Sequence, residues 1–162
     1  PSGDYLALAR SIQPGLPLYG NLQLISPEAA KTLPDIDEGI IAFFWSPDGA
    51  KLAYVTPTQR SGVFRWNILR VRDGETWPLV EFAPSTDMVT LRQFFDQYAY
   101  SHSLWSPDSR YLVFAGSLSG GAVTAAMSGD PGHQGSHVFT VDTGPTLEIT
   151  TVASGFLGFW SP

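Results

Sequence analysis

One phrase recurs through this chain and constrains its fold more than any other feature. Residues 45–55 read WSPDGAKLAYV, and residues 105–115 read WSPDSRYLVFA. Residues 1–9 (PSGDYLALA) repeat the phrase without its Trp-Ser, and residues 159–162 (FWSP) repeat only its beginning. The prolines at positions 1, 47, 107 and 162 lie 46, 60 and 55 residues apart. Such phasing indicates a repeat architecture, in which each unit buries an apolar face against its neighbours.

The phrase itself is typical of a β-hairpin. An apolar strand over residues 40–45 leads into a turn at Pro47, Asp48 and Gly49. In such a turn proline fixes φ, aspartate bonds nearby backbone, and glycine tolerates a positive φ. A second strand rich in aliphatic and aromatic residues then leaves the turn, over residues 51–55 in one copy and 111–115 in the other.

A second hairpin follows the first in each unit. Its two strands are expected at residues 21–26 and 31–34 in the first unit, 66–72 and 76–82 in the second, and 137–141 and 146–152 in the third. The chain is therefore predicted to be all-β, with three four-stranded antiparallel meanders at about residues 1–46, 47–106 and 107–162. The 16 glycines and 13 prolines suit such a turn-rich chain. Meanders that stack on one another are the blades of a β-propeller.

The WSPDG phrase, with its apolar strand and its later Asp-Gly turn, resembles the repeat of the TolB-type β-propeller family, which is related in architecture to WD40-like repeats. The resemblance covers nearly the whole chain as three consecutive units. It implies a ring that is usually six-bladed, of which three blades form about half. The resemblance also extends to periplasmic adaptor proteins and to peptidase propeller domains, and it therefore favours an extracytoplasmic, periplasmic location.

The first and last units are complementary in this repeat. The first unit begins after the Trp-Ser and so lacks an innermost strand. Residues 155–160 are expected to act as the innermost strand of a following blade. Two explanations stay open: the chain is a segment of a longer propeller chain, or it pairs with a second copy whose first unit residues 155–160 complete.

The irregular length of the chain falls on one face of the predicted blades. The turns inside each hairpin lie on one face, whereas the connections between hairpins and between blades lie on the other. The long connections on that second face are residues 11–20, 56–63, 83–103 and 116–136. Rigid scaffolds commonly carry their recognition residues on such loops.

Residues 83–103 are the one convincing helix candidate. Ser85 or Thr86 is expected to cap the helix, and apolar residues recur at helical spacing at Met88, Leu91, Phe94, Phe95 and Tyr98. Two interpretations are open: the apolar stripe closes the mouth of the propeller, or it is an aromatic docking element. Residues 116–136, rich in glycine, serine and alanine, are expected to form a loop.

Metal and cofactor chemistry finds little support in the sequence. The chain has no cysteine, which excludes disulfides, thiolate metal ligands and cysteine nucleophiles. His133 and His137 lie four residues apart, but no third ligand accompanies them. Asp35, Asp37 and Glu38 lack the full ligand pattern of a calcium loop. We therefore expect neither a metal site nor a cofactor.

Catalysis and nucleic-acid binding are not expected either. The segment GSLSG at residues 116–120 has leucine where the nucleophile of a G-x-S-x-G elbow stands, and there is no P-loop or dinucleotide fingerprint. The formal net charge of −6 makes nucleic acid a poor partner. No apolar run approaches the roughly 18–20 residues that a membrane-spanning helix requires.

These observations favour a non-catalytic propeller segment that serves as a scaffold for a protein or peptide partner, with recognition through the long loops. The alternative is an accessory propeller that gates a larger hydrolase of the prolyl-oligopeptidase type. Trp45, Trp105 and Trp160 recur in phase and are expected to pack in the core. The candidate partner-binding residues are Phe94, Phe95, Tyr98, His102, His133 and Trp66, the last because it lies outside the repeat register.

Overall fold

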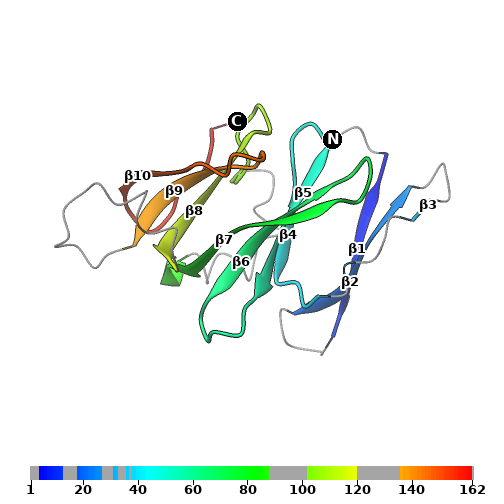
Figure 1. The fold of residues 1–162 in the computed structure, drawn as a ribbon, viewed down its shortest axis with the longest axis horizontal. Coiled ribbons are helices and arrows are strands. Elements are labelled where there is room, and N and C mark those ends of the chain that lie inside the picture. The colour runs from blue at the N-terminus through cyan, green and yellow to red at the C-terminus, as the bar shows by residue number, and fades with distance from the viewer. Residues whose placement is uncertain are drawn as a thin grey trace.

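The structure is a computed structural model that describes residues 4–12, 18–26, 31–32, 36, 38–87, 102–119 and 136–161. In these residues the chain forms two antiparallel sheets, one of three strands and one of seven (Figure 1). The strands are β1 (Leu6–Ser11), β2 (Tyr19–Ser26), β3 (Lys31–Thr32), β4 (Ala42–Trp45), β5 (Lys51–Pro57), β6 (Phe64–Arg70), β7 (Thr76–Pro84), β8 (Tyr111–Leu118), β9 (His137–Asp142) and β10 (Ile149–Ser154). The fold is all-β and built from propeller blades, as the repeat predicts.

In the structure the strand that precedes each WSPD turn belongs with the strands that follow it, so β4 is counted from here on with the second unit although it lies within residues 1–46, and Trp105 with the third. The second unit is then a complete four-stranded meander of β4, β5, β6 and β7. Its first hairpin pairs Trp45 with Leu52, and its second pairs Leu69 with Thr76. Gly49 has a φ of 71° in the first turn and Gly74 a φ of 75° in the second, which are conformations that glycine adopts at little cost. The turn residues of the sequence therefore set the hairpins where they were expected.

The first and third units contain the second, third and fourth strands of the same plan. In the first unit these are β1, β2 and the short β3. In the third unit β8, β9 and β10 follow one another, and a single bridge between Trp105 and Leu112 stands where the second unit has its innermost strand. Residues 155–160 form no strand, and Trp160 makes one antiparallel bridge with Ser103. Their role in a following blade stays a prediction.

The second and third units are joined along their edges as well as their faces. The end of β7 pairs with the end of β8, so that Phe82 faces Leu118 and Pro84 faces Gly116. Gly116 has a φ of 154°, and a Cβ at this position would lie 2.1 Å from the carbonyl oxygen of Ala83. The close approach of two backbones, which only glycine permits, turns seven strands into one curled sheet.

The core lies between the units rather than within them. Leu22 and Leu24 of β2 share one buried cluster with Leu52 and Tyr54 of β5. A larger cluster fills the space between the second and third units, and aromatic rings run through it: Phe44, Trp66, Phe82, Phe114 and Phe139. Trp105 is 2% exposed, whereas Trp45 and Trp160 are partly buried at the margins of the clusters. Stacked faces thus supply the apolar burial that stabilises each meander.

The expected helix and loop fall largely outside the described residues. Residues 83–84 and 116–118 belong to β7 and β8, and residues 86–87 are helical directly after Ser85. Residues 88–101 and 120–135 are not among those the structure describes. No helix in the described part of the chain is long and apolar enough to cross a membrane.

Candidate functional site

The repeated turn folds through the same hydrogen bonds in both complete copies of the phrase. Ser46 Oγ donates to Asp48 Oδ1 at 2.6 Å and accepts from the backbone amide of Lys51 at 2.9 Å. Ser106 Oγ donates to Asp108 Oδ1 at 2.5 Å and accepts from the amide of Tyr111 at 2.8 Å. The serine and the aspartate of the phrase therefore clamp the turn from inside.

The electrostatics of the two turn aspartates follow from these bonds. Burial acts to raise the pKa of Asp48, but hydrogen bonds from Ser46, Ala50 and Ser109 together hold that pKa below its usual value. The bond from Ser106 lowers the pKa of Asp108 in the same way. Both carboxylates are therefore charged and fixed at neutral pH.

The two turns also touch each other across the boundary between units. The backbone amide of Asp48 donates to Ser109 Oγ at 3.1 Å. Ser109 has a φ of 60° and stands where the other copy of the phrase has Gly49. It is only 3% exposed. A serine in a left-handed conformation thus links the turns of the second and third units.

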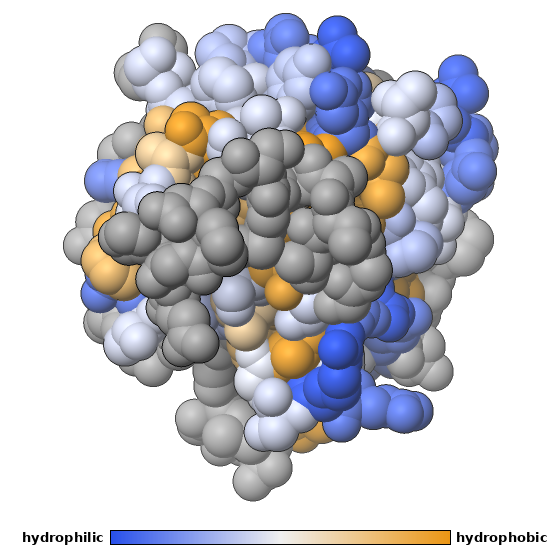
Figure 2. All heavy atoms as spheres, turned by 60° about the vertical axis from the view of Figure 1, so that its left-hand side comes forward, coloured by the Kyte–Doolittle hydropathy of each residue, from blue (hydrophilic) through white to orange (hydrophobic). Residues whose placement is uncertain are grey.

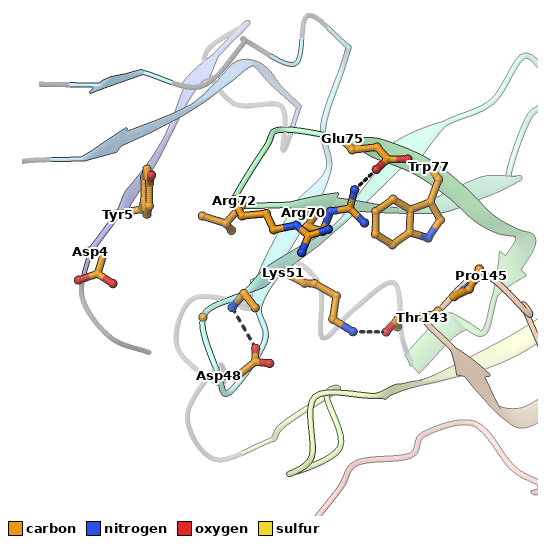
Figure 3. A pocket seen from close by; sticks show the side chains of 14 residues that line it. Asp4, Tyr5, Asp48, Lys51, Arg70, Arg72, Glu75, Trp77, Thr143 and Pro145 are labelled. Carbon is orange, nitrogen blue, oxygen red and sulfur yellow. Dashed lines mark hydrogen bonds and ion pairs between the residues drawn. The ribbon is translucent and has the colours of Figure 1, made fainter. Parts of the chain in front are cut away.

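Next to these turns lies a hollow of about 850 Å³, which we name the turn-face hollow (Figure 3). All three units contribute to it. Its walls are Asp4 and Tyr5 of the first unit, residues 48–51 and 70–72 with Glu75 and Trp77 of the second, and residues 143–145 of the third. Because the hairpin turns line it, the hollow opens on the face opposite the long connections.

Lys51 lies at the inner side of the hollow and bridges the second and third units. Its Nζ donates to Thr143 Oγ1 at 2.8 Å and lies 5.5 Å from the centre of the Trp105 ring. Trp105 in turn donates through Nε1 to the carbonyl oxygen of Phe44 at 3.1 Å. Burial lowers the pKa of the Lys51 ammonium, although Asp48, Asp142 and Asp108 nearby act to raise it.

Arg70 and Trp77 form one wall of the hollow. The Arg70 guanidinium carbon lies 5.8 Å from the centre of the Trp77 ring, a cation–π arrangement. Arg70 Nε also donates to Asp73 Oδ1 at 2.9 Å, and its Nη2 forms an ion pair with Glu75. The bond from Arg70 lowers the pKa of Asp73 to about 2. Arg72, whose side chain is 75% exposed, stands at the rim.

A smaller hollow of about 360 Å³ adjoins the first, with Lys51 in the wall of both. Arg110 donates to Asp142 Oδ2 through Nε at 3.0 Å and through Nη2 at 2.9 Å. The other carboxylate oxygen of Asp142 accepts from the amide of Gly144 at 2.7 Å. Charged groups of both signs therefore surround Lys51, and most of them are already paired.

The residues predicted from sequence are not gathered at this hollow. Phe94, Phe95, Tyr98 and His133 lie outside the described residues. His102 is partly buried, and its ring meets the ring of Phe159 edge-on at 4.7 Å between centres. The described part of the chain contains no group of three or more His, Cys, Asp or Glu side chains that could hold a metal ion.

Trp66 has a different place from the expected one. It is 2% exposed and lies between Phe44 and Phe82, with ring centres 5.9 and 6.1 Å away. The prediction of a surface role rested on its position outside the tryptophan register. That position is in β6, opposite Val55 of β5, where the side chain faces the next blade instead of solvent. Trp66 is therefore a core residue.

Trp77, like Trp66, lies outside the tryptophan register and was a candidate for a surface role, but sequence reasoning did not single out Lys51 or Thr143. One signal was present: Lys51 takes the place in the phrase that Tyr5 and Tyr111 hold in the other units. Lys51 is thus the one charged residue at this place among the three copies of the phrase.

The comparisons with known proteins show the fold. No family model matches the chain, and no curated protein matches it. Three solved structures of similar fold are TolB from Acinetobacter baumannii (16% identity, TM-score 0.50), the β-propeller domain of the Trilobed protease from Pyrococcus furiosus (16%, 0.51) and the acylaminoacyl peptidase of Pyrococcus horikoshii (14%, 0.52). The matches cover 94%, 91% and 92% of this chain but only 31%, 43% and 23% of those chains.

Proposed function

We propose that the chain is a non-catalytic β-propeller segment that serves as a protein-interaction scaffold, and that the turn-face hollow is one of its recognition surfaces. The observation that carries the proposal is the hollow itself, to which all three units contribute. Its walls stand on short turns that internal hydrogen bonds hold in place. A surface already held in shape costs less conformational entropy when a partner binds.

The chemistry of the hollow suits a polypeptide segment. Tyr5 and Trp77 are half-buried and offer aromatic faces on opposite sides (Figure 3). Arg72 and Asp4 are exposed and offer charges of both signs. A peptide that inserts one apolar side chain and pairs its own charges at the rim satisfies all of these groups. Tyrosine, tryptophan and arginine are also the residues enriched at the energetic centres of protein interfaces.

The long connections on the opposite face are proposed as a second recognition surface on the argument from sequence. Phe94, Phe95, Tyr98 and His133 belong to those connections, and His102 lies at the end of one of them.

The chain has no cysteine, so a single introduced cysteine can be labelled at one chosen position, which allows a direct test of the hollow. Peptides that bind the chain are first selected from a random display library. A photo-crosslinker is then attached to a single cysteine introduced into the chain, and its crosslinking to the bound peptide is measured. Ala50→Cys places it at the hollow. Ala153→Cys, on an exposed position of β10 outside both the hollow and the long connections, is the matched control. We expect crosslinking from position 50 and not from position 153.

Two substitutions make this test sharper. Arg72→Glu reverses a rim charge and Trp77→Ala removes an aromatic wall, and each is expected to weaken peptide binding at least about tenfold, since one lost contact of 1.4 kcal/mol gives that factor. Binding that is unchanged in both variants, without crosslinking at position 50, overturns the hollow as a recognition surface.

A second candidate function is that of an accessory propeller that gates a larger hydrolase resembling prolyl oligopeptidase. It is favoured by the similarity in fold to an acylaminoacyl peptidase and to the propeller domain of a protease. The coding sequence on either side of this segment distinguishes the two, because an α/β-hydrolase segment with a nucleophile elbow in the same polypeptide selects the gating role. Under either proposal we expect this chain alone not to hydrolyse fluorogenic esters or peptides.

A further inference from the structure

Two cationic side chains lie next to each other at the wall of the turn-face hollow. Lys51 at the start of β5 is directly opposite Arg70 at the end of β6, and both residues line the hollow. Directly opposite residues share one face of a sheet, and like charges in such a pair are destabilising. In the third unit the matching pair is Tyr111 and Asp142, which contains no cation. The repeat therefore does not require two cations at this place.

The two cations differ in how their charges are balanced. Arg70 donates to Asp73 and forms an ion pair with Glu75. Lys51 is partly buried and forms no ion pair with any residue that the structure describes. Its Nζ donates one hydrogen bond, to the neutral hydroxyl of Thr143, whereas a lysine ammonium has three N–H groups. Two N–H groups of Lys51 are therefore left for an acceptor that this part of the chain does not supply.

Three carboxylates lie near Lys51, but each is held by other bonds. Asp48 and Asp108 each accept from the serine hydroxyl of their own turn. Asp142 accepts from two nitrogens of the Arg110 guanidinium. Together the three carboxylates act to raise the pKa of the Lys51 ammonium, yet burial lowers that pKa by more. The surroundings of Lys51 therefore do not balance its charge in full, and an added anion stabilises it.

The hollow of about 850 Å³ has room for such an anion and for the peptide that carries it. Figure 3 shows Lys51 and Arg72 among the side chains around the hollow, with Tyr5 and Trp77 on opposite sides. A carboxylate accepts from several donors at once, so it can take up the two remaining N–H groups of Lys51. Apolar atoms next to it in the same peptide then meet the two aromatic rings. Arg72, whose side chain is 75% exposed, adds a second cation at the rim.

We propose that Lys51 binds a carboxylate of the partner polypeptide, so that the turn-face hollow selects acidic or C-terminal segments. The inference rests on the proposed function, because it gives the partner of that hollow a chemical class. The same group has two sources, an Asp or Glu side chain and the C-terminus of the partner. The net charge of −6 repels an acidic partner at long range, so the selectivity comes from the direct contact at Lys51.

Competition between peptides tests the proposal. Three mixtures of short N-acetylated peptides share the same random apolar flanks: the first has a central Glu and an amidated C-terminus, the second a central Gln and an amidated C-terminus, and the third a central Gln and a free C-terminal carboxylate. Equal amounts compete for the immobilised chain, and mass spectrometry counts the retained peptides. We expect at least one carboxylate mixture to be retained about tenfold more than the neutral mixture, because hydrogen bonds between charged groups are among the strongest in proteins. The mixture that is enriched identifies the source of the carboxylate.

Variants of the two lysines of the chain locate the effect. Lys51→Gln keeps an N–H donor for Thr143 and removes the charge, and it is expected to abolish the enrichment. Lys51→Arg keeps the charge and is expected to retain part of the enrichment. Lys31→Gln, in β3, removes the other lysine and is the matched control, with the enrichment unchanged.

The neutral mixture measures the binding that needs no charge. Val152 and Phe156 are each 58% exposed, and Figure 2 shows hydrophobic residues mixed with hydrophilic ones at the surface on the third-unit side. Apolar flanks can bind there as well as at the hollow, and to the same extent in all three mixtures. The ratio between mixtures therefore reports the carboxylate, and unchanged retention of the neutral mixture by Lys51→Gln shows that the fold is intact.

A wild-type chain that retains all three mixtures equally, or an enrichment that survives Lys51→Gln, overturns the proposal. In the first case, peptides that crosslink from position 50 still show the hollow to be a recognition surface, so the proposed function stands without the carboxylate. Failure of the proposed function looks different: no mixture is retained and no selected peptide crosslinks from position 50, which overturns the roles of the hollow and of Lys51 together.

Discussion

Ser109 shows how one residue couples two units of a repeat. Its φ of 60° is close to the 71° of Gly49 at the matching place, although serine has a Cβ that disfavours this region. Its hydroxyl accepts from the amide of Asp48 in the neighbouring turn. The left-handed backbone of Ser109 therefore lowers the free energy of unfolding, and its hydrogen bond to Asp48 raises it by a similar amount.

This balance predicts different effects for two substitutions at one position. Ser109→Ala loses the bond and keeps the backbone cost, so the free energy of unfolding is expected to fall by about 1 kcal/mol. Ser109→Gly loses the bond but relieves the backbone, and is expected to stay within about 0.5 kcal/mol of wild type. Urea unfolding midpoints measure both, and an alanine variant as stable as the glycine variant contradicts the account.

Tyr54 predicts a pH dependence. Burial raises the pKa of its phenol from 10.0 to about 12, and nearby Glu38 acts in the same direction. Because the pKa of Tyr54 is higher in the folded state than in the unfolded state, its protonated phenol contributes to the free energy of unfolding. This contribution is fully present below pH 10 and is lost as the pH rises through 12. The size of the shift corresponds to about 2–3 kcal/mol.

Tyr54→Phe should therefore reduce the loss of stability at alkaline pH. The measurement compares the urea midpoints of both proteins at pH 9 and pH 11.5. We expect the wild type to lose more stability over this interval than the variant. Other titrating groups contribute equally to the two proteins, so identical losses would show that Tyr54 ionises freely in the folded state.

At the scale of the elements, the edge pairing of β7 with β8 depends on one glycine. A Cβ at Gly116 would lie 2.1 Å from the carbonyl oxygen of Ala83, and backbone cannot move away as a flexible side chain can. The amide of Ser85 donates to the carbonyl oxygen of Ala115 at 3.3 Å next to this point. The pairing of these strands is therefore expected to fail when position 116 has a side chain.

Gly116→Ala is expected to lower the free energy of unfolding by at least about 2 kcal/mol, through the clash and the unfavourable φ together. Gly62→Ala is the matched control, because Gly62 has a φ of 74° and open space around it, and its cost is the backbone cost alone, about 1 kcal/mol. Hydrogen exchange reports the location: the amide of Ser119, which donates to Glu81 at 3.0 Å, should exchange faster only in Gly116→Ala.

The strands could be predicted from sequence because each hairpin is set by local chemistry. The turns of Pro47, Gly49 and Gly74 need only their neighbours in the chain. The pairing at Gly116 could not be predicted in this way. It depends on how far the second and third units are rotated relative to each other, and no short segment encodes that angle.

At the scale of the whole molecule, the same limit applies to the turn-face hollow. Lys51 and Thr143 are 92 residues apart and meet only because two units stack. The repeat shows that units stack, but it gives neither the distance between their turns nor the side chains that meet there. The surface role predicted for Trp66 was wrong for a related reason: whether its side chain is buried depends on which blade covers that side of β6.

The blade junctions lead to a prediction about the whole molecule, for which the repeat supplies three equivalent leucines. Leu52 and Leu112 are fully buried at junctions between units, whereas Leu6 is 55% exposed. Truncation of a buried leucine removes its transfer free energy and leaves a cavity, which together cost about 2–5 kcal/mol. Leu52→Ala and Leu112→Ala are expected to lose this amount of free energy of unfolding, and Leu6→Ala less than about 1 kcal/mol. Urea unfolding followed by tryptophan fluorescence measures all three, and equal losses would mean that the exposed face of β1 is covered within one chain.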